Sequence, residues 1–340
     1  MSRVIGFPGA ASRQESGAEL SRHTKSLYGT KDFREKRRRI ESRHLRPGGH
    51  QGRGSFHLEN VHLICTLLRA VLCVSGMLRR GERNALDSRL RTLEFEFANL
   101  PASFEGFRIL HLSDIHADGL AGLAEASCAR LRGLEADLCV LTGDYRYDIE
   151  GSCAAVYPEM GKILACVRAK HGVVGILGNH DFAEKIVHLE RMGVRVLMND
   201  SLEIRRGIES IWICGVDDPH YYGCDDLPGA LAPVPEGAFK VLLAHSPELY
   251  EEAADRGIDL YLCGHTHAGQ VCLPGGIPIV LNTSAPRRFA RGIWRHGHVQ
   301  GYTSAGIGCS LLPVRFNCPP EITLIELRTK QEGTGAGSPP

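Results

Sequence analysis

Five short apolar runs in this chain each end in residues that can bind a metal ion, and this repetition is its most restrictive feature. Short apolar runs with polar ends are typical of buried β-strands, and α/β folds gather their ligands at the carboxyl ends of such strands. The sequence therefore predicts one polar site built from five separate segments. These segments contain Asp114-Ile-His116, Asp144, Asn179-His180-Asp181, His245 and His265-Thr-His267.

Helical stretches separate several of the apolar runs, and this alternation is typical of an α/β fold. Strands are expected within 107–114, 138–144, 172–181, 211–218, 240–246 and 260–267. Helices are expected at about 119–133, 153–169, 182–192 and 247–255. Around 193–215 and 277–327 strands follow one another without helices. We therefore expect an α/β fold (an α+β sandwich) of two packed sheets with helices outside.

The residue types at the strand ends suit divalent metal ions. Residues i and i+2 of a strand share a face, so Asp114 with His116, and His265 with His267, form two aligned pairs. Oxygen and nitrogen ligands without cysteine favour Mn, Fe, Zn or Co over Ca. Four His, two Asp and one Asn are too many for one ion and about right for two, in which case one carboxylate must bridge. A single D-x-H is a weak signal, whereas GNHD and GHTH together in one chain are a strong one.

With these motifs, the chain resembles the calcineurin-like metallophosphoesterase superfamily over about residues 107–327. The resemblance implies a four-layer fold of two mixed sheets flanked by helices. It also implies two divalent ions, with Mn as the first expectation. One ion would be held by Asp114, His116, Asp144 and His267, and the second by Asp144, Asn179, His245 and His265.

The resemblance further implies a hydrolytic reaction at phosphorus. Two bound cations lower the pKa of a shared water and offset the charge that develops on the phosphoryl group. His180 matches the histidine that faces the scissile phosphate, where it stabilises the transition state or protonates the leaving group. Asp181 matches the orienting partner of that histidine. The alternative for His180 is a hydrogen-bonded loop residue without a catalytic role.

Longer segments are similar to a bacterial branch of membrane-tethered or exported enzymes that includes UDP-2,3-diacylglucosamine pyrophosphatases. They are LSDIHAD (112–118), LTGDY (141–145), GVDDP (215–219), HSPE (245–248), GHTHAGQV (264–271) and LPVRFNCPPEITLIEL (312–327). This similarity implies hydrolysis of an acylated sugar nucleotide to UMP and 2,3-diacylglucosamine 1-phosphate in lipid A synthesis. One alternative is a broad-specificity phosphodiesterase or phosphomonoesterase outside the cytoplasm. Another is a non-catalytic membrane scaffold, against which the full ligand set argues.

Substrate anions need hydrogen-bond donors beyond the metal ions, and several residues near the motif ends are candidates. Each arginine is equally well interpreted as a solvated surface residue, and the histidine and tyrosine as parts of a plain turn. The candidates are Arg146, Arg287, Arg288, His220 and Tyr222, with Arg291 and Tyr221 beside them.

The net charge of +1 hides two unlike parts: residues 1–55 carry +8 and the remainder −7. An acidic body is a poor surface for nucleic acid, so no nucleic-acid partner is expected. The leader has few apolar residues, and we expect it to be unordered. Alternatively, it precedes a later start such as Met77.

Residues 61–78 are apolar and have basic neighbours on both sides. A helix of this length reaches about 27 Å, against about 30 Å for a bilayer core, and Arg69 would lie near its centre. Its polar residues form one stripe, which favours a helix lying in a membrane surface. A marginal span and a soluble helix docked on the body remain alternatives.

These patterns divide the chain into four parts. We expect a basic leader (1–55), a membrane-associating helix and linker (58–92), a catalytic domain (93–328) and a flexible tail (329–340). The expected location is the cytoplasmic face of the inner membrane, with export as the alternative. The 12 cysteines include no CxxC pair and often lie in apolar runs, so we expect free, buried thiols in a reducing compartment rather than a disulfide framework.

Overall fold

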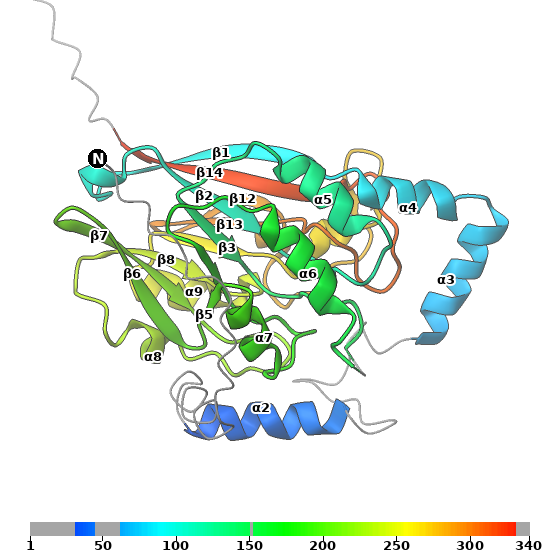
Figure 1. Cartoon of the computed structure of the whole chain (residues 1–340), viewed down its shortest axis with the longest axis horizontal. Helices are drawn as coiled ribbons and strands as arrows, with labels where there is room; N and C mark the ends of the chain where they lie inside the picture. Colours follow the sequence, from blue (N-terminus) through cyan, green and yellow to red (C-terminus); the bar gives the residue numbers. More distant parts are fainter. Residues whose placement is uncertain (1–30, 45–61, 150–151, 331–340) are drawn as a thin grey trace, which may run out of the picture.

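The computed structural model describes residues 31–44, 62–149 and 152–330, and its centre is a pair of six-stranded sheets (Figure 1). The first sheet has the order β1-β14-β2-β3-β4-β5, formed by Arg89–Phe97, Glu321–Thr329, Phe107–Leu112, Leu138–Leu141, Val173–Gly175 and Val194–Val196. The second has the order β12-β13-β9-β8-β7-β6, formed by Gly292–His296, Val299–Thr303, Leu260–Cys263, Phe239–Leu243, Glu209–Gly215 and Asp200–Arg206. A short ribbon pairs β10 (Cys272–Leu273) with β11 (Ile277–Pro278).

Both large sheets are mixed. In the first, β2, β3, β4 and β5 run parallel, while β14 pairs antiparallel with β2 and parallel with β1. In the second, β13, β9, β8 and β7 run parallel, and β12 and β6 are antiparallel edge strands. The expected α/β sandwich of two packed sheets is confirmed.

One core lies between the two sheets and another on the outer face of the first sheet, because alternate residues of each strand face opposite sides. On β2, Ile109 packs toward the second sheet, whereas Leu110 and Leu112 belong to a cluster on the outer face. Ile213 and Leu262 of the second sheet belong to the same buried cluster as Ile109. Each such side chain contributes roughly 1.5–3 kcal/mol when it is fully buried. The strands that carry the site are therefore firmly held.

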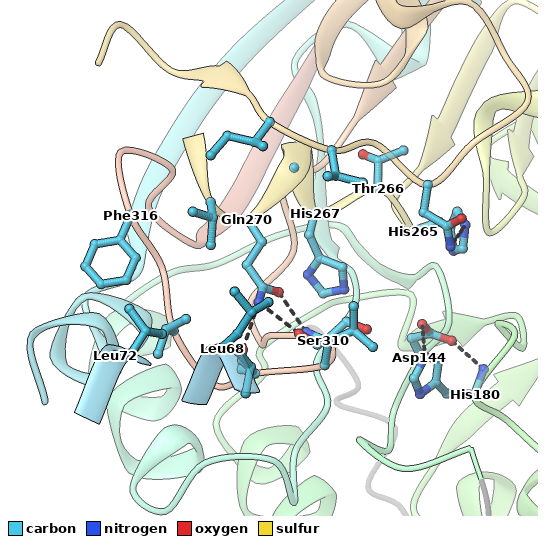
Figure 2. A pocket seen from close by; sticks show the side chains of 18 of the residues that line it. Leu68, Leu72, Asp144, His180, His265, Thr266, His267, Gln270, Ser310 and Phe316 are labelled. Carbon is cyan, nitrogen blue, oxygen red and sulfur yellow. Dashed lines mark hydrogen bonds and ion pairs between the residues drawn. The ribbon is translucent and has the colours of Figure 1, made fainter. Parts of the chain in front are cut away.

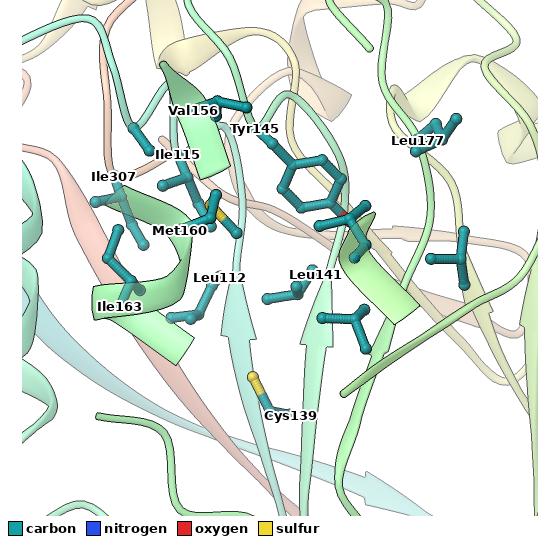
Figure 3. Close-up of a cluster of buried hydrophobic side chains, with 14 of the residues drawn as sticks. Leu112, Ile115, Cys139, Leu141, Tyr145, Val156, Met160, Ile163, Leu177 and Ile307 are labelled. Atoms are coloured by element: carbon teal, nitrogen blue, oxygen red, sulfur yellow. The ribbon is translucent and has the colours of Figure 1, made fainter. Parts of the chain in front are cut away.

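Helices cover both outer faces and complete four layers. The outer face of the first sheet packs against α5 (Leu123–Leu131), α6 (Val156–Ala165) and α7 (Lys185–Arg191), and Figure 3 shows Val156, Met160 and Ile163 over Leu112 and Leu141. The second sheet packs against α8 (Leu227–Leu231) and α9 (Tyr250–Asp255). Single 3-10 turns form at η2 (Ala102–Phe104), η3 (Pro247–Leu249), η4 (His267–Gly269) and η5 (Arg287–Phe289).

The four predicted helices of the catalytic domain lie where the sequence places them but are shorter, and α8 was not predicted. The expected helix at 119–133 begins only after Gly122, whose φ of 85° is left-handed and outside any α-helix. The predicted domain start at 93 falls inside β1, which pairs with β14 from Arg89 onward. The catalytic domain therefore begins earlier than predicted.

The basic leader contains a helix, so the expectation of an unordered segment is wrong for α2 (Lys31–His44). Arg37 of this helix is buried, pairs with Asp217 and donates to the Asp181 carbonyl. The remainder of the predicted leader, and residues 331–340 of the predicted tail, lie outside the described residues. Glu41 accepts the Ala183 N–H at 2.9 Å, and Phe33 and Ile40 pack against the Tyr221–Tyr222 cluster, so several contacts join this helix to the catalytic domain.

The expected helix over 61–78 is α3 (His62–Val74), which ends four residues early, and a separate helix, α4 (Leu78–Leu86), begins where the apolar run stops. The chain turns between them at Gly76, whose φ is 68°. Among the described residues, no helix has both the length and the apolar character required to cross a membrane.

One pair of cysteines departs from the prediction. Cys128 and Cys166 form a disulfide, with 5.5 Å between their Cα atoms, that links α5 to the residue after α6. Of the nine free cysteines whose side chains the structure describes, eight are buried as expected and Cys73 is exposed.

Candidate active site

The five predicted clusters meet at one edge of the sandwich, where the carboxyl ends of strands from both sheets come together. Asp114 and His116 follow β2, Asp144 follows β3, and Asn179 and His180 follow β4 of the first sheet. His245 follows β8 of the second sheet, and His265 and His267 follow β9. All of these side chains are buried, with at most 5% of their surface exposed.

The backbone at these strand ends has an uncommon conformation. Five residues of the site have φ between 42° and 68°, in the left-handed region that side chains other than glycine rarely adopt. Each such residue costs on the order of 1–3 kcal/mol and persists only where the surroundings enforce it. Their concentration at one point marks a functional site. They are Asp114, His116, Asp144, His265 and His267.

Glycines allow the loops to approach one another closely. A Cβ atom added to Gly178 would collide with the Asp144 carboxylate, and one added to Gly264 would collide with Ser113 and Asp114. The glycines of GNHD and GHTH are thus required by the packing of the carboxylates beside them.

The first group of ligand atoms comes from Asp114, His116 and His267. The Nδ1 of His116 lies 2.6 Å from the Arg146 carbonyl, to which it donates, so its Nε2 presents a lone pair. This Nε2 lies 3.2 Å from the Nε2 of His267, which is 3.8 Å from Asp114 Oδ1.

The second group comes from His245, His265 and Asn179. The Nδ1 of His245 donates to the Thr142 carbonyl at 2.7 Å, so in the neutral ring its Nε2 carries the lone pair. That Nε2 lies 2.9 Å from Asn179 Oδ1 and 3.2 Å from His265 Nδ1. A proton or a cation must lie between acceptor atoms this close, and a single divalent cation can bind all three at once.

Asp144 lies between the two groups. Its Oδ2 is 3.6 Å from His116 Nε2 and 3.4 Å from His245 Nε2. In addition, the buried Asn179 Nδ2 has no hydrogen-bond partner in the described residues. The nitrogen and oxygen donors, their convergence and the shared carboxylate all fit two divalent metal ions with one bridging ligand.

Burial sets the protonation of most of these groups. It lowers the pKa values of His265 and His267 well below the ordinary value, assisted at His267 by the Arg315 charge. Burial alone would raise the pKa of Asp144, but His245 and His180 outweigh it, so this carboxyl stays ionised. The Asp144 charge has the opposite effect on His245: burial alone would lower the pKa of this ring, but Asp144 raises it well above the ordinary value. A bound cation would therefore displace the His245 proton, since neutral imidazoles and an ionised carboxylate are the forms that bind metal.

His180 lies beside the metal-ligand groups, with Nε2 3.9 Å from Asp144 Oδ2. Burial lowers its pKa to about 4. Its Nδ1 donates to the Tyr147 carbonyl at 2.6 Å, and this contact fixes the ring.

The predicted orienting role of Asp181 is therefore corrected. Its carboxylate accepts the backbone N–H groups of Asp144 (2.7 Å) and Gly178 (2.9 Å), and pairs with Lys185 at 3.0 Å. Asp181 thus joins the loops after β3 and β4, and the Tyr147 carbonyl holds the His180 ring.

The predicted substrate-binding residues do not all lie near the site. Arg146 and Tyr222 are buried away from the cavity: the Arg146 guanidinium lies over the Phe182 ring, and Tyr222 lies under Arg37. Both expectations are corrected. His220 is close to the site, with its ring 4.2 Å from that of His265.

The other two arginines lie on the surface. Arg287 donates to the Pro278 carbonyl at 3.1 Å, and the Arg288 guanidinium lies 4.5 Å from the Phe289 ring. Their proposed contact with substrate stays a prediction.

Two residues beside the metal ligands were not singled out from the sequence. Arg315 is fully buried and lies 3.0 Å from His267 Nδ1, and it also donates to the His267 carbonyl at 3.1 Å. Glu248 pairs with His220 at 2.6 Å. Both lie in segments noted for their similarity, LPVRFNCPP and HSPE, but no spacing rule connects them to the site.

A cavity of about 410 Å³ opens directly onto these residues. At one end it is lined by Asp144, Asn179, His180, His265 and His267. At the other end its lining is apolar and includes residues of α3, as Figure 2 shows for Leu68 and Leu72 beside Phe316.

Comparison with known proteins gives matches over the same region. Residues 107–269 match the family described as calcineurin-like phosphoesterase. The chain is 33% identical to phosphodiesterase YaeI of Escherichia coli, over 65% of this chain and 82% of that protein. It is 32% identical to the uncharacterized metallophosphoesterase YkuE of Bacillus subtilis, over 75% and 90%. It is 28% identical to a transmembrane protein with metallophosphoesterase domain of Danio rerio, over 81% and 64%.

Proposed function

Because this chain belongs to the calcineurin-like phosphoesterase family, we propose that its polar centre binds two divalent cations and hydrolyses a phosphodiester or pyrophosphate bond. The observation that carries this proposal is the meeting of two groups of nitrogen and oxygen donors on Asp144. We assign the first ion to Asp114, His116, Asp144 and His267, and the second to Asp144, Asn179, His245 and His265. Mn is the first candidate among Mn, Fe, Zn and Co.

The bound pair of ions would supply an activated water and neutralise charge on the phosphoryl oxygens. The protein residues hold the geometry. Asp181 ties the Asp144 loop to the Gly178 loop, and the Thr142 and Arg146 carbonyls fix the tautomers of His245 and His116. His180 points its Nε2 toward the centre. The negative charge of a bound phosphoryl group favours the protonated ring, and in that form the Nε2–H binds or protonates a substrate oxygen.

For the natural substrate we propose UDP-2,3-diacylglucosamine, cleaved to UMP and 2,3-diacylglucosamine 1-phosphate at the cytoplasmic face of the inner membrane. The similarity of the longer motifs supports this choice. The apolar end of the cavity suits an acylated molecule, and the Danio rerio relative is named as a transmembrane protein.

A second candidate is a broad-specificity phosphodiesterase outside the cytoplasm. The Cys128–Cys166 disulfide favours it, since disulfides persist mainly in oxidising compartments. The Escherichia coli relative is named a phosphodiesterase without a stated substrate.

Both candidates are tested with purified protein and Mn²⁺, using UDP-2,3-diacylglucosamine and bis-p-nitrophenyl phosphate as parallel substrates and a chelator as control. We expect chelator-sensitive hydrolysis of both, with UDP-2,3-diacylglucosamine preferred. Strong activity on bis-p-nitrophenyl phosphate alone would defeat the lipid A assignment. No activity on either substrate, with any of the four metals, would defeat the enzymatic one.

A further inference from the structure

We propose that the apolar end of the active-site cavity binds a single hydrocarbon chain of the substrate, and that helix α3 forms one wall of this subsite. The inference rests on the proposed function, because the phosphorus of the same molecule would lie at the Asp144 end. It goes further by assigning a binding role to a helix outside the family-matched region, which begins at residue 107.

Three segments enclose the apolar end. Leu68, Val71 and Leu72 lie at i, i+3 and i+4 of α3 and therefore share one helical face. The second segment, residues 271–280, contributes Val271, Ile279 and Val280. The third segment, residues 311–316, contributes Leu311, Leu312, Val314 and Phe316. In Figure 2, Leu68, Leu72 and Phe316 gather at one side and Asp144 and His180 at the other.

Helix α3 is placed through α4, which docks closely on the catalytic domain. A Cβ atom at Gly81 of α4 would lie 2.7 Å from that of Val314, so only glycine permits this approach. The Gly81 carbonyl accepts the Arg315 N–H at 3.1 Å, and Asn84 donates to the Arg315 carbonyl at 2.8 Å. Arg315 also contacts His267, so one residue links the wall of the cavity to a metal ligand.

The loop at 310–312 is fixed by Gln270. Its Nε2 donates to the carbonyls of Ser310 and Leu312 at 2.8 Å each, and its Oε1 accepts the Ser310 N–H at 2.8 Å. These bonds pair the carbonyls of Ser310 and Leu312 and the N–H of Ser310. The Leu311 and Leu312 side chains are then left to line the cavity.

The apolar character of the lining indicates which kind of group binds there. Neither Lys nor Arg is among the described residues that line the cavity, so this end offers no cation to a phosphate or a nucleotide. Leu68 and Val71 remain 50% and 63% exposed, and Ile279 56%, although they are apolar. The volume lies within the usual range of roughly 300–1,000 Å³ for small-molecule sites. Because the space is continuous with Asp144 and His180, we assign it to a chain of the reacting molecule rather than to bilayer lipid or a second protein.

The test is a homologous series of p-nitrophenyl alkyl phosphates with methyl, butyl and octyl chains, each kept below its micelle concentration. Hydrolysis breaks the bond from phosphorus to the p-nitrophenyl oxygen in every member, so only the alkyl chain differs. Each buried CH₂ can raise kcat/KM by up to about fourfold. We expect the octyl ester to exceed the methyl ester by roughly a hundredfold, since the groove buries the chain only in part.

Leu68→Asp and Leu67→Asp form a matched pair, since the neighbouring leucines are similarly exposed and only Leu68 lines the cavity. Leu68→Asp should lower the octyl-to-methyl ratio of kcat/KM at least about tenfold, because the bound alkyl chain would remove water from a charged carboxylate. Leu67→Asp should leave the ratio within about twofold of wild type. Circular dichroism and Tm confirm that both variants are folded.

Three results would overturn the inference. One is a wild-type kcat/KM that does not change with the length of the alkyl chain. If the protein then also binds anionic phospholipid vesicles, α3 would be a membrane contact and not a wall of the substrate site. Another is an equal fall for all esters in Leu68→Asp. The third is inactivity on every ester and on bis-p-nitrophenyl phosphate, which would remove the proposed function as well and is thereby distinguished from the first two.

Discussion

The polar and apolar ends of the active-site cavity are held in opposite ways. At the polar end, side chains such as Asp144 and His245 are buried, hydrogen-bonded and carried by strand ends, several with left-handed backbone. At the apolar end, Leu68 and Val71 are about half exposed and belong to a helix that packs mainly on α4. In Figure 1, α3 lies at the margin of the molecule, away from the sheets.

This difference separates the reaction from the choice of substrate. The reaction needs atoms fixed to fractions of an ångström, which only the strand ends of a packed sandwich supply. A hydrocarbon chain needs only apolar surface of the right size, which a peripheral helix can provide. Substitutions at the polar end should therefore affect all substrates equally, whereas those at the apolar end should discriminate among substrates by chain length.

The largest effect is expected from Asp144→Asn at the polar end. An amide cannot bridge two cations as a carboxylate does, so kcat/KM should fall by about 10³–10⁴-fold for every substrate, whatever its alkyl chain. Metal content by atomic absorption should fall in parallel, while circular dichroism stays unchanged. Turnover like that of the wild type would end the two-metal account.

His180→Ala should give the next largest effect. His180 belongs to neither of the proposed ligand sets, so both ions should be retained while kcat falls by about 10²–10³-fold through loss of a donor to the substrate oxygens. The methyl and octyl esters should lose equally. A normal kcat would exclude His180 from the reaction, and loss of metal would make it a ligand instead.

The polar end was largely predictable from sequence because strand ends reveal it. An apolar run followed by Asn179-His180 or His265-Thr-His267 fixes which face and which edge the side chains occupy. The contacts that the motif residues make with distant parts of the chain could not be predicted. Arg315 reaches His267 across 48 positions, and no local pattern records such a pairing.

The apolar end was not predictable for a related reason. Residues 61–78 have the composition of a membrane-surface helix, and the turn at Gly76 together with the close fit of Gly81 on Val314 appear only in three dimensions. Likewise, the positive charge of residues 31–44 predicts a solvated tail until Asp217 provides a buried partner for Arg37. In both segments, residues far away in the sequence determine where the helix lies.

A third prediction concerns the Glu248–His220 pair, which supports the polar end. Burial alone would raise the pKa of Glu248, but the hydrogen bond and charge of His220 and the Ser284 N–H outweigh it and lower the pKa to about 2. As pH falls from about 4.5 to 2, the unfolded chain takes up a proton first, so the free energy of unfolding falls. The loss is at most about 3 kcal/mol.

Glu248→Gln removes this titration. Urea unfolding of both proteins between pH 6 and 2.5 should show the wild type as more stable at pH 6 and the two converging at the acid end. A difference in unfolding free energy that stays constant with pH would show that the pair has no such electrostatic role.

The smallest effect should come from Gly81→Ala, which tests how the apolar end is attached. The added methyl group meets Val314 at 2.7 Å, so α4 must shift, at a cost of about 1–3 kcal/mol in unfolding free energy. Gly161→Ala is the matched control, because this helical glycine has only Met192 Sδ near its Cβ position, at 3.9 Å, and alanine there should be neutral or stabilising by up to about 1 kcal/mol. Since α4 positions α3, Gly81→Ala should also lower the octyl-to-methyl ratio of kcat/KM, and Gly161→Ala should not. A destabilised Gly81→Ala protein with the full wild-type ratio would show that α3 reaches the cavity independently of α4, which would contradict the attachment of the apolar end through Gly81 and Val314.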